Sequence, residues 1–76
     1  MKKITKKELR EYARLGIATD ITGLCFDEAE ELRRSHNLVT LALSYGTYGM
    51  TGALLSDESG AMYAITARNS TLFQLV

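Results

Sequence analysis

The fold class is decided by residues 38–45, Leu38-Val39-Thr40-Leu41-Ala42-Leu43-Ser44-Tyr45. This stretch is short, apolar and partly β-branched, a composition that favours a strand over a buried helix. The chain before it has apolar residues at helical spacing, and the chain after it has short apolar runs separated by glycines. The sequence therefore changes from helices to strands near residue 38, which predicts an α+β fold.

Upstream of this stretch, the sequence predicts a first helix over residues 6–18. Thr5 and Glu8 have the spacing of a capping box, in which the side chain of each residue accepts a hydrogen bond from the backbone N–H of the other. Small and apolar residues then follow the i, i+3, i+4, i+7 stripe of an amphipathic helix: Leu9, Tyr12, Ala13, Gly16 and Ile17.

A second helix is predicted over residues 27–36, with Asp27 as its N-cap. Its acidic residues gather near the positive end of the helix dipole and its basic residues near the negative end. Asn37 suits the left-handed position that follows a helix. A connector over residues 20–25 separates the two helices, so we expect a helical hairpin.

Downstream, three strands are predicted over residues 38–45, 50–56 and 61–67. The second and third strands are joined by a turn, Asp57-Glu58-Ser59-Gly60, with Gly60 in the left-handed position. Residues 71–75 form either a fourth strand or a docked terminus. The expected architecture is a single α+β domain over residues 1–76, with an N-terminal helical hairpin followed by a three- or four-stranded antiparallel sheet.

Gly46, Gly49 and Gly52 recur every three residues between the first two strands. A glycine-rich loop can bind phosphate through its backbone amides, but the known nucleotide-binding loops follow a strand and open a helix. These glycines lie between strands, and no lysine follows Asn37. We therefore expect a hairpin connection, with Gly52 marking a bulge or a close approach of two backbones.

The composition excludes several classes of protein. Nine Lys and Arg residues against nine Asp and Glu give a formal net charge of zero, unlike the strongly basic domains that bind polyanions through overall charge. One cysteine can form neither an intrachain disulfide nor a structural zinc site, which usually takes four ligands. The start MKKITKKEL is not followed by the apolar segment of a signal peptide, and no apolar run is long enough to span a bilayer. The sequence predicts a cytoplasmic protein without a membrane contact.

Charge is nevertheless distributed unevenly along the chain. Residues 1–14 carry six basic and two acidic side chains, a net charge of +4. Residues 15–36 carry two basic and five acidic side chains, a net charge of −3. These two segments could attract each other within one chain or between two chains. The charged residues of the remaining segment, residues 37–76, are only Asp57, Glu58 and Arg68.

The scarcity of charge in residues 37–76 leads to the main functional prediction. Helices on one side of a sheet leave its other face uncovered, and an uncovered apolar face or strand edge promotes association. We therefore expect a homodimer or larger oligomer formed through the sheet, or a contact with another protein. The predicted interface residues are Tyr45, Tyr48, Leu54, Tyr63, Arg68 and Phe73. The competing interpretation is a tight monomer whose sheet curls on itself.

The alternative function is that of a small nucleic-acid-binding accessory protein. The basic side chains of residues 1–14 could contact phosphates, while Tyr45 and Tyr48 could stack on bases. Those basic residues are Lys2, Lys3, Lys6, Lys7, Arg10 and Arg14. Only Arg68 accompanies the tyrosines in the predicted sheet, so the tyrosines fit a protein interface better than a nucleic-acid surface.

An enzyme is not expected from this sequence. Cys25 and His36 are its only cysteine and histidine. Cys25 is predicted to be a buried small hydrophobe and His36 to lie in the last turn of the second helix. Helix capping explains the carboxylates of residues 27–31. No catalytic residue, cofactor site or metal site is predicted, and the expected function is a non-enzymatic, self-associating interaction or regulatory module.

Three segments carry a resemblance to other proteins: Thr5-Lys6-Lys7-Glu8-Leu9, Asp20-Ile21-Thr22 and residues 63–73, YAITARNSTLF. In these segments the chain resembles a family of small uncharacterised bacterial proteins, found among the hypothetical genes of mobile elements and of gut Gram-positive bacteria. The resemblance covers nearly the whole chain. It implies a stand-alone product with no known activity, and it assigns no functional residue.

Overall fold

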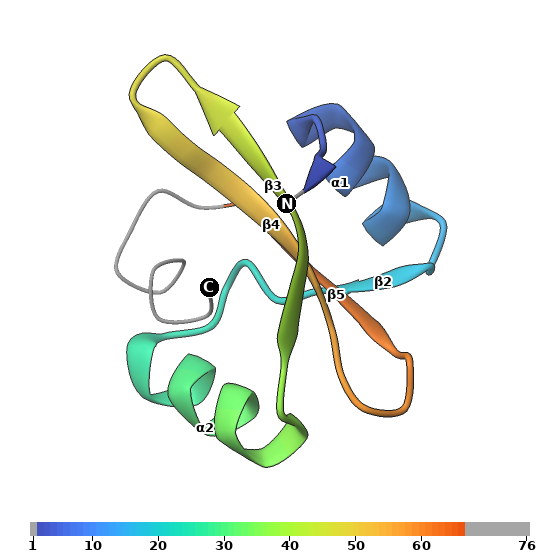
Figure 1. The fold of residues 1–76 in the computed structure, drawn as a ribbon, viewed down its shortest axis with the longest axis vertical. Coiled ribbons are helices and arrows are strands. Elements are labelled where there is room, and N and C mark those ends of the chain that lie inside the picture. Colours follow the sequence, from blue (N-terminus) through green and yellow to red (C-terminus); the bar gives the residue numbers. More distant parts are fainter. Residues whose placement is uncertain (1, 67–76) are drawn as a thin grey trace.

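Two helices are interleaved with a five-stranded mixed sheet in the computed structural model, which describes residues 2–66 (Figure 1). The elements in chain order are β1 (Lys2–Lys3), α1 (Lys6–Arg14), β2 (Ala18–Asp20), α2 (Phe26–His36), β3 (Val39–Gly46), β4 (Gly49–Ser56) and β5 (Met62–Ile65). The strand order across the sheet is β1-β3-β4-β5-β2. The predicted α+β class is confirmed, and the strand expected over residues 71–75 lies outside the described residues.

The antiparallel part of the sheet confirms the three central strand predictions. β3 pairs with β4, and β4 pairs with β5, both antiparallel. The bounds of these strands differ from the predicted ones by at most two residues. Gly60 closes the β4–β5 turn in the left-handed region, with φ of 90°, as the sequence predicts.

The two edge strands show that the helical hairpin and the purely antiparallel sheet are wrong. β1 runs parallel to β3, with Lys2 opposite Ala42, and β2 runs parallel to β5, with Ala18 opposite Met62. Parallel neighbours need a long crossover connection, and both helices lie in the connection from β1 to β3. The helices are therefore separated by an edge strand and are not joined by a tight turn.

The first helix begins where predicted but ends at Arg14 and not at residue 18. The capping box is confirmed, because the Glu8 N–H donates to Thr5 Oγ1 at 3.0 Å and the Thr5 N–H donates to Glu8 Oε1 at 3.2 Å. Gly16 then takes a left-handed φ of 76°, a conformation that ends helices. The residues that follow are free to form β2.

The second helix agrees with the prediction except at its N-cap. It spans Phe26–His36, and Asn37 follows it in the left-handed region with φ of 51°. The N-cap is Cys25 and not Asp27, because Cys25 has an extended backbone, with ψ of 172°, just before the first helical residue. Its N–H donates to Glu28 Oε1 at 3.3 Å. Cys25 is also exposed, so the expectation that it is a buried hydrophobe is wrong.

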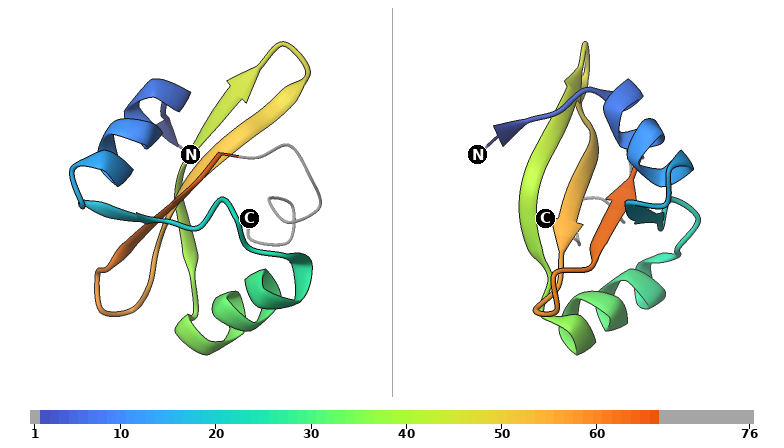
Figure 2. Two further views of the ribbon diagram at one scale, coloured as in Figure 1. Left: turned by 180° about the vertical axis from the view of Figure 1, so that it is seen from behind. Right: turned by 90° about the vertical axis from the view of Figure 1, so that its right-hand side faces the viewer.

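The core lies on both faces of the sheet. Leu54 of β4 packs in one cluster with Leu9 of α1, whereas its neighbours Ala53 and Leu55 pack in another with Ala29 of α2. Successive side chains of a strand point to opposite faces, so the two helices cover opposite faces. Figure 1 shows them on either side of the diagonal β3–β4 ribbon, and Figure 2 shows the strong twist of the sheet between them. This double coverage explains why apolar and polar residues alternate so weakly in β4.

Gly52 lies where two backbones approach closely, as the sequence predicts. A Cβ atom at this position would lie 2.6 Å from the Ile65 carbonyl oxygen and 2.7 Å from Leu9 Cδ1. The β3–β4 register shifts beside it, which leaves Thr51 as an extra residue in β4. The glycines at residues 46–52 therefore belong to a hairpin and its bulge, and they do not open a helix.

Candidate interaction site

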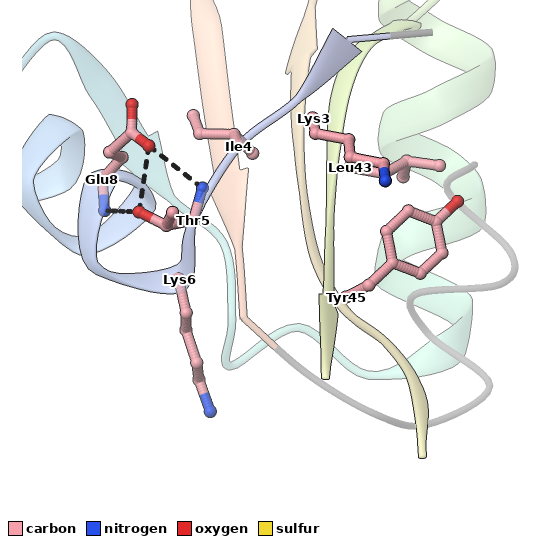
Figure 3. Close-up of a pocket in the computed structure, with 7 residues that line it drawn as sticks. All are labelled: Lys3, Ile4, Thr5, Lys6, Glu8, Leu43 and Tyr45. Atoms are coloured by element: carbon pink, nitrogen blue, oxygen red, sulfur yellow. Dashed lines mark hydrogen bonds between the residues drawn. The ribbon is translucent and has the colours of Figure 1, made fainter. Parts of the chain in front are cut away.

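A groove of about 610 Å³ lies where the chain passes from β1 into α1 beside β3 (Figure 3). Its lining residues are Lys3, Ile4, Thr5, Lys6, Glu8, Leu43 and Tyr45. We call this feature the β1–α1 groove. A smaller cavity of about 170 Å³ adjoins it and shares Lys3, Ile4 and Glu8.

Pairing of the edge strand with β3 builds the floor of the groove. Lys3 lies opposite Leu43 in the parallel ladder, and the Ile4 N–H donates to the Leu43 carbonyl oxygen at 3.0 Å. The capping box begins one residue later and fixes the direction in which α1 leaves the sheet. These contacts fix the chain where β1 passes into α1, so the groove has a defined shape.

The groove combines apolar side chains with positive charge: Leu43 and Tyr45 lie on one side of β3 and Ile4 lies on the other. Ile4 and Leu43 are half-buried, and the Tyr45 side chain is 59% exposed. Figure 3 shows Lys3 on the side of β3 that carries Tyr45, while Lys6 projects from the start of α1. Such a surface suits a partner that offers an apolar or aromatic group together with negative charge.

The single carboxylate of the groove is engaged by its own helix. Glu8 Oε1 accepts hydrogen bonds from the Thr5 N–H at 3.2 Å and from Thr5 Oγ1 at 3.0 Å. Lys3 and Lys6 form no ion pair within residues 2–66. The two ammonium groups of the groove are therefore not neutralised by a carboxylate of the described chain.

The predicted interface residues are dispersed. Tyr45 lies in the β1–α1 groove, and Tyr48, 83% exposed, lies in the β3–β4 turn. Leu54 is buried beneath α1, so it serves the core and does not reach the surface. Tyr63 is half-buried and its hydroxyl donates to Asp57 Oδ2 at 3.0 Å. The other two, Arg68 and Phe73, lie outside the described residues.

The predicted nucleic-acid residues are all exposed, but they do not form one site. Lys3 and Lys6 line the β1–α1 groove, and Lys2 lines only the smaller cavity. Arg14 pairs with Glu11 on α1. The remaining two, Lys7 and Arg10, lie on α1 and line neither cavity.

The charged segments do not neutralise each other within the described chain. Both Arg–Glu pairs of residues 2–66 are local to one helix: Glu11 with Arg14 on α1, and Glu30 with Arg34 on α2. The positive β1–α1 segment and the negative α2 segment therefore keep their separate charges.

A second polar cluster joins the end of α2 to the β4–β5 turn. Asp57 Oδ1 accepts hydrogen bonds from the Ser59 N–H at 2.9 Å, Ser59 Oγ at 2.6 Å and the Ala61 N–H at 3.1 Å. The Ser59 hydroxyl holds the pKa of Asp57 below its ordinary value, with help from Tyr63 and the backbone and against an opposing effect of burial. The same carboxylate raises the pKa of Tyr63. Since these bonds close the β4–β5 turn, the role of the cluster is structural.

Cys25 and His36 lie at opposite ends of α2, so the helix itself separates them. His36 lies in the last turn, as predicted, with Nδ1 4.0 Å from Asp57 Oδ2. Within residues 2–66, no group of three or more His, Cys, Asp or Glu side chains is placed to hold a metal ion. No helix in this part of the chain is long and apolar enough to cross a bilayer.

Comparison with known proteins adds no functional information. No protein-family model, no curated protein and no solved structure matches the chain. The resemblance to small uncharacterised bacterial proteins stays a prediction.

Proposed function

We propose that this protein is a non-enzymatic interaction module that self-associates, with the β1–α1 groove as its contact surface. The observation that carries the proposal is the exposed Tyr45 side chain, which lies with Leu43 and Lys3 on one side of β3. The two lysines of this groove form no ion pair within residues 2–66. Tyrosine is enriched at protein interfaces because it offers a large apolar body with a polar tip.

The short edge strand supports the same proposal. Among residues 2–66, β1 pairs with Ala42 and Leu43 only, so the outer edge of β3 extends beyond it on both sides. Val39, on that strand, is 59% exposed, and Leu41 is 40% exposed. An apolar edge of this kind is a surface that a partner chain can cover.

The first test is the mass in solution, measured by light scattering on a sizing column over a range of concentrations. We expect the mass to rise above that of the 8.4 kDa chain as concentration increases. Tyr45→Glu places a carboxylate on an exposed side chain, so it should reduce association without unfolding the protein.

Leu15→Glu provides the matched control. Leu15 is 56% exposed, similar to Tyr45, but it lies at the end of α1 outside the groove. This variant should associate like the wild type. A wild-type mass of 8.4 kDa at every concentration, or equal loss of association in both variants, would contradict the proposal.

Binding of single-stranded nucleic acid is the second candidate function. The observation in its favour is that Lys3 and Lys6 line the same groove as Tyr45, which places cations beside an aromatic side chain. A base can stack on an aromatic ring while its phosphate contacts a lysine. The net charge of zero for the whole chain leaves this candidate second.

A salt titration separates the two functions. Fluorescence anisotropy of a labelled random oligonucleotide should show binding at low salt that weakens steeply as salt rises. Lys3→Gln/Lys6→Gln should abolish it, whereas Lys7→Gln/Arg10→Gln, which removes the same charge outside the groove, should preserve most of it. Absence of binding at low ionic strength would exclude this function.

A further inference from the structure

We propose that the occupant of the β1–α1 groove is the start of α2 of a second copy, with Phe26 against Leu43 and Tyr45 and its acidic neighbours against Lys3 and Lys6. This inference rests on the proposed self-association, and it identifies the other half of the contact. The complementary surface is present on the same chain.

The start of α2 carries an apolar side chain that the fold leaves uncovered. Phe26, the first residue of the helix, is 45% exposed, whereas Ala29 on the core side of the same helix is fully buried. On one side of β3 the groove offers Leu43 and Tyr45 as apolar contacts. Burial of a phenyl ring among such side chains is a strong source of affinity.

Charge complementarity supports this occupant. Asp27 and Glu31, one helical turn apart, are exposed and form no ion pair within residues 2–66. Lys3 and Lys6 in the groove likewise form no ion pair within residues 2–66. Opposite charges around an apolar contact accelerate association and select its orientation.

The chain does not place its own α2 in its own groove. Figure 1 shows the beginning of α2 at the opposite end of the molecule from β1 and the start of α1. No ion pair joins the two segments in the described part of the chain. The basic groove of one molecule and the acidic start of α2 of another are therefore both available for a contact between them.

A charge exchange between two variants tests the pairing. One variant is Lys3→Glu/Lys6→Glu, with a negative groove, and the other is Asp27→Lys/Glu31→Lys, with a positive helix start. Each variant alone brings like charges together, so its self-association should weaken by roughly tenfold or more. In an equimolar mixture both groove–helix contacts pair opposite charges, and light scattering should show association restored.

Two controls separate a lost contact from a lost fold. Far-UV circular dichroism should show the same helix content in both variants as in the wild type. Phe26→Ala should weaken association, whereas Ile17→Ala should not, because Ile17 is 47% exposed but lies between α1 and β2, outside the groove.

The two proposals fail in different ways. A wild-type protein that stays monomeric overturns the self-association itself. A wild-type oligomer whose association survives in both reversed variants, or whose mixed variants fail to associate, overturns only the pairing of the groove with α2. Association that is weak in each variant by itself and restored in the mixture supports the pairing. In that case the restored contact must join the groove of one variant to the α2 of the other.

Discussion

Gly52 has no side chain, and this lets three neighbouring elements approach its Cα atom closely. The position at which a side chain would begin is occupied from three directions by Ile65 of β5, Leu9 of α1 and Ser44 of β3. The Ser44 hydroxyl is itself buried and lies 3.0 Å from Thr51 Oγ1, so it already has a hydrogen-bond partner. A larger residue would have to displace either backbone or a satisfied polar group.

Gly52→Ala should therefore destabilise the protein by about 2 kcal/mol or more, because the added methyl group overpacks the core. The free energy of unfolding from urea denaturation measures the effect. Gly23→Ala is the matched control, since a Cβ atom there would meet nothing within 4 Å. An equal effect of both substitutions would show that the close approach is not the cause.

At the scale of elements, the β4–β5 turn anchors the end of α2. Asp57 closes the turn through Ser59, and the Asn37 side chain after α2 donates to Glu58 Oε1 at 2.8 Å. Tyr63 of β5 donates to the other oxygen of Asp57. Two neighbouring carboxylates therefore divide the work: Glu58 accepts a hydrogen bond from the residue after α2, and Asp57 holds the hairpin together.

The lowered pKa of Asp57 predicts a specific dependence of stability on pH. The folded pKa lies below the ordinary value of 3.8, so the carboxylate stabilises the fold above that value and ceases to do so as pH falls through the folded pKa. The difference in unfolding free energy between the wild type and Asp57→Asn should therefore be greatest near neutral pH and shrink below pH 3.8.

Ser59→Ala provides a graded comparison. The Ser59 hydroxyl is the largest cause of the lowered pKa, so its removal should weaken the pH dependence without abolishing it. Urea denaturation at several pH values measures all three proteins. A difference between wild type and Asp57→Asn that is independent of pH would contradict the role given to the charge.

Helices and central strands could be predicted from the sequence because their signals are local. Thr5 and Glu8 are three residues apart, and the β4–β5 hairpin is closed by one short turn. β2 could not be predicted, because its three residues become a strand only by pairing with Met62–Ala64, far along the chain. The helical stripe through Ile17 concealed it further.

The candidate site was predictable only in part for the same reason. The basic start and Tyr45 both stand out in the sequence, but their meeting depends on the register that places Lys3 opposite Leu43. No local spacing specifies that register. The burial of Leu54 likewise follows from α1 covering a face of the sheet that the predicted architecture leaves open.

At the scale of the whole molecule, the sheet separates two small cores. Leu9 belongs to the cluster beneath α1, and Leu54 lies in the same cluster. Leu55, the next residue of β4, belongs to the cluster beneath α2. Neither helix can bury its apolar face against the other, so each depends on the sheet between them.

This division predicts which core substitutions are additive. Leu9→Val and Leu55→Val act on opposite faces, so their effects on the unfolding free energy should add within about 0.5 kcal/mol. Leu9→Val and Leu54→Val share one cluster, so their double variant should depart from additivity by more than that amount. Double-mutant cycles in urea measure both couplings, and the reverse pattern would place both helices on one face.

The pairing of β2 with β5 also has a consequence for protein synthesis. The ribosome releases Ala18–Asp20 well before Met62–Ile65, so the edge strand emerges without the neighbour that completes its hydrogen bonds. α1 and α2 can form as the chain emerges, because their hydrogen bonds are local. The sheet itself can be completed only after Met62–Ile65 has emerged, so the helices can form while β2 still lacks its neighbour.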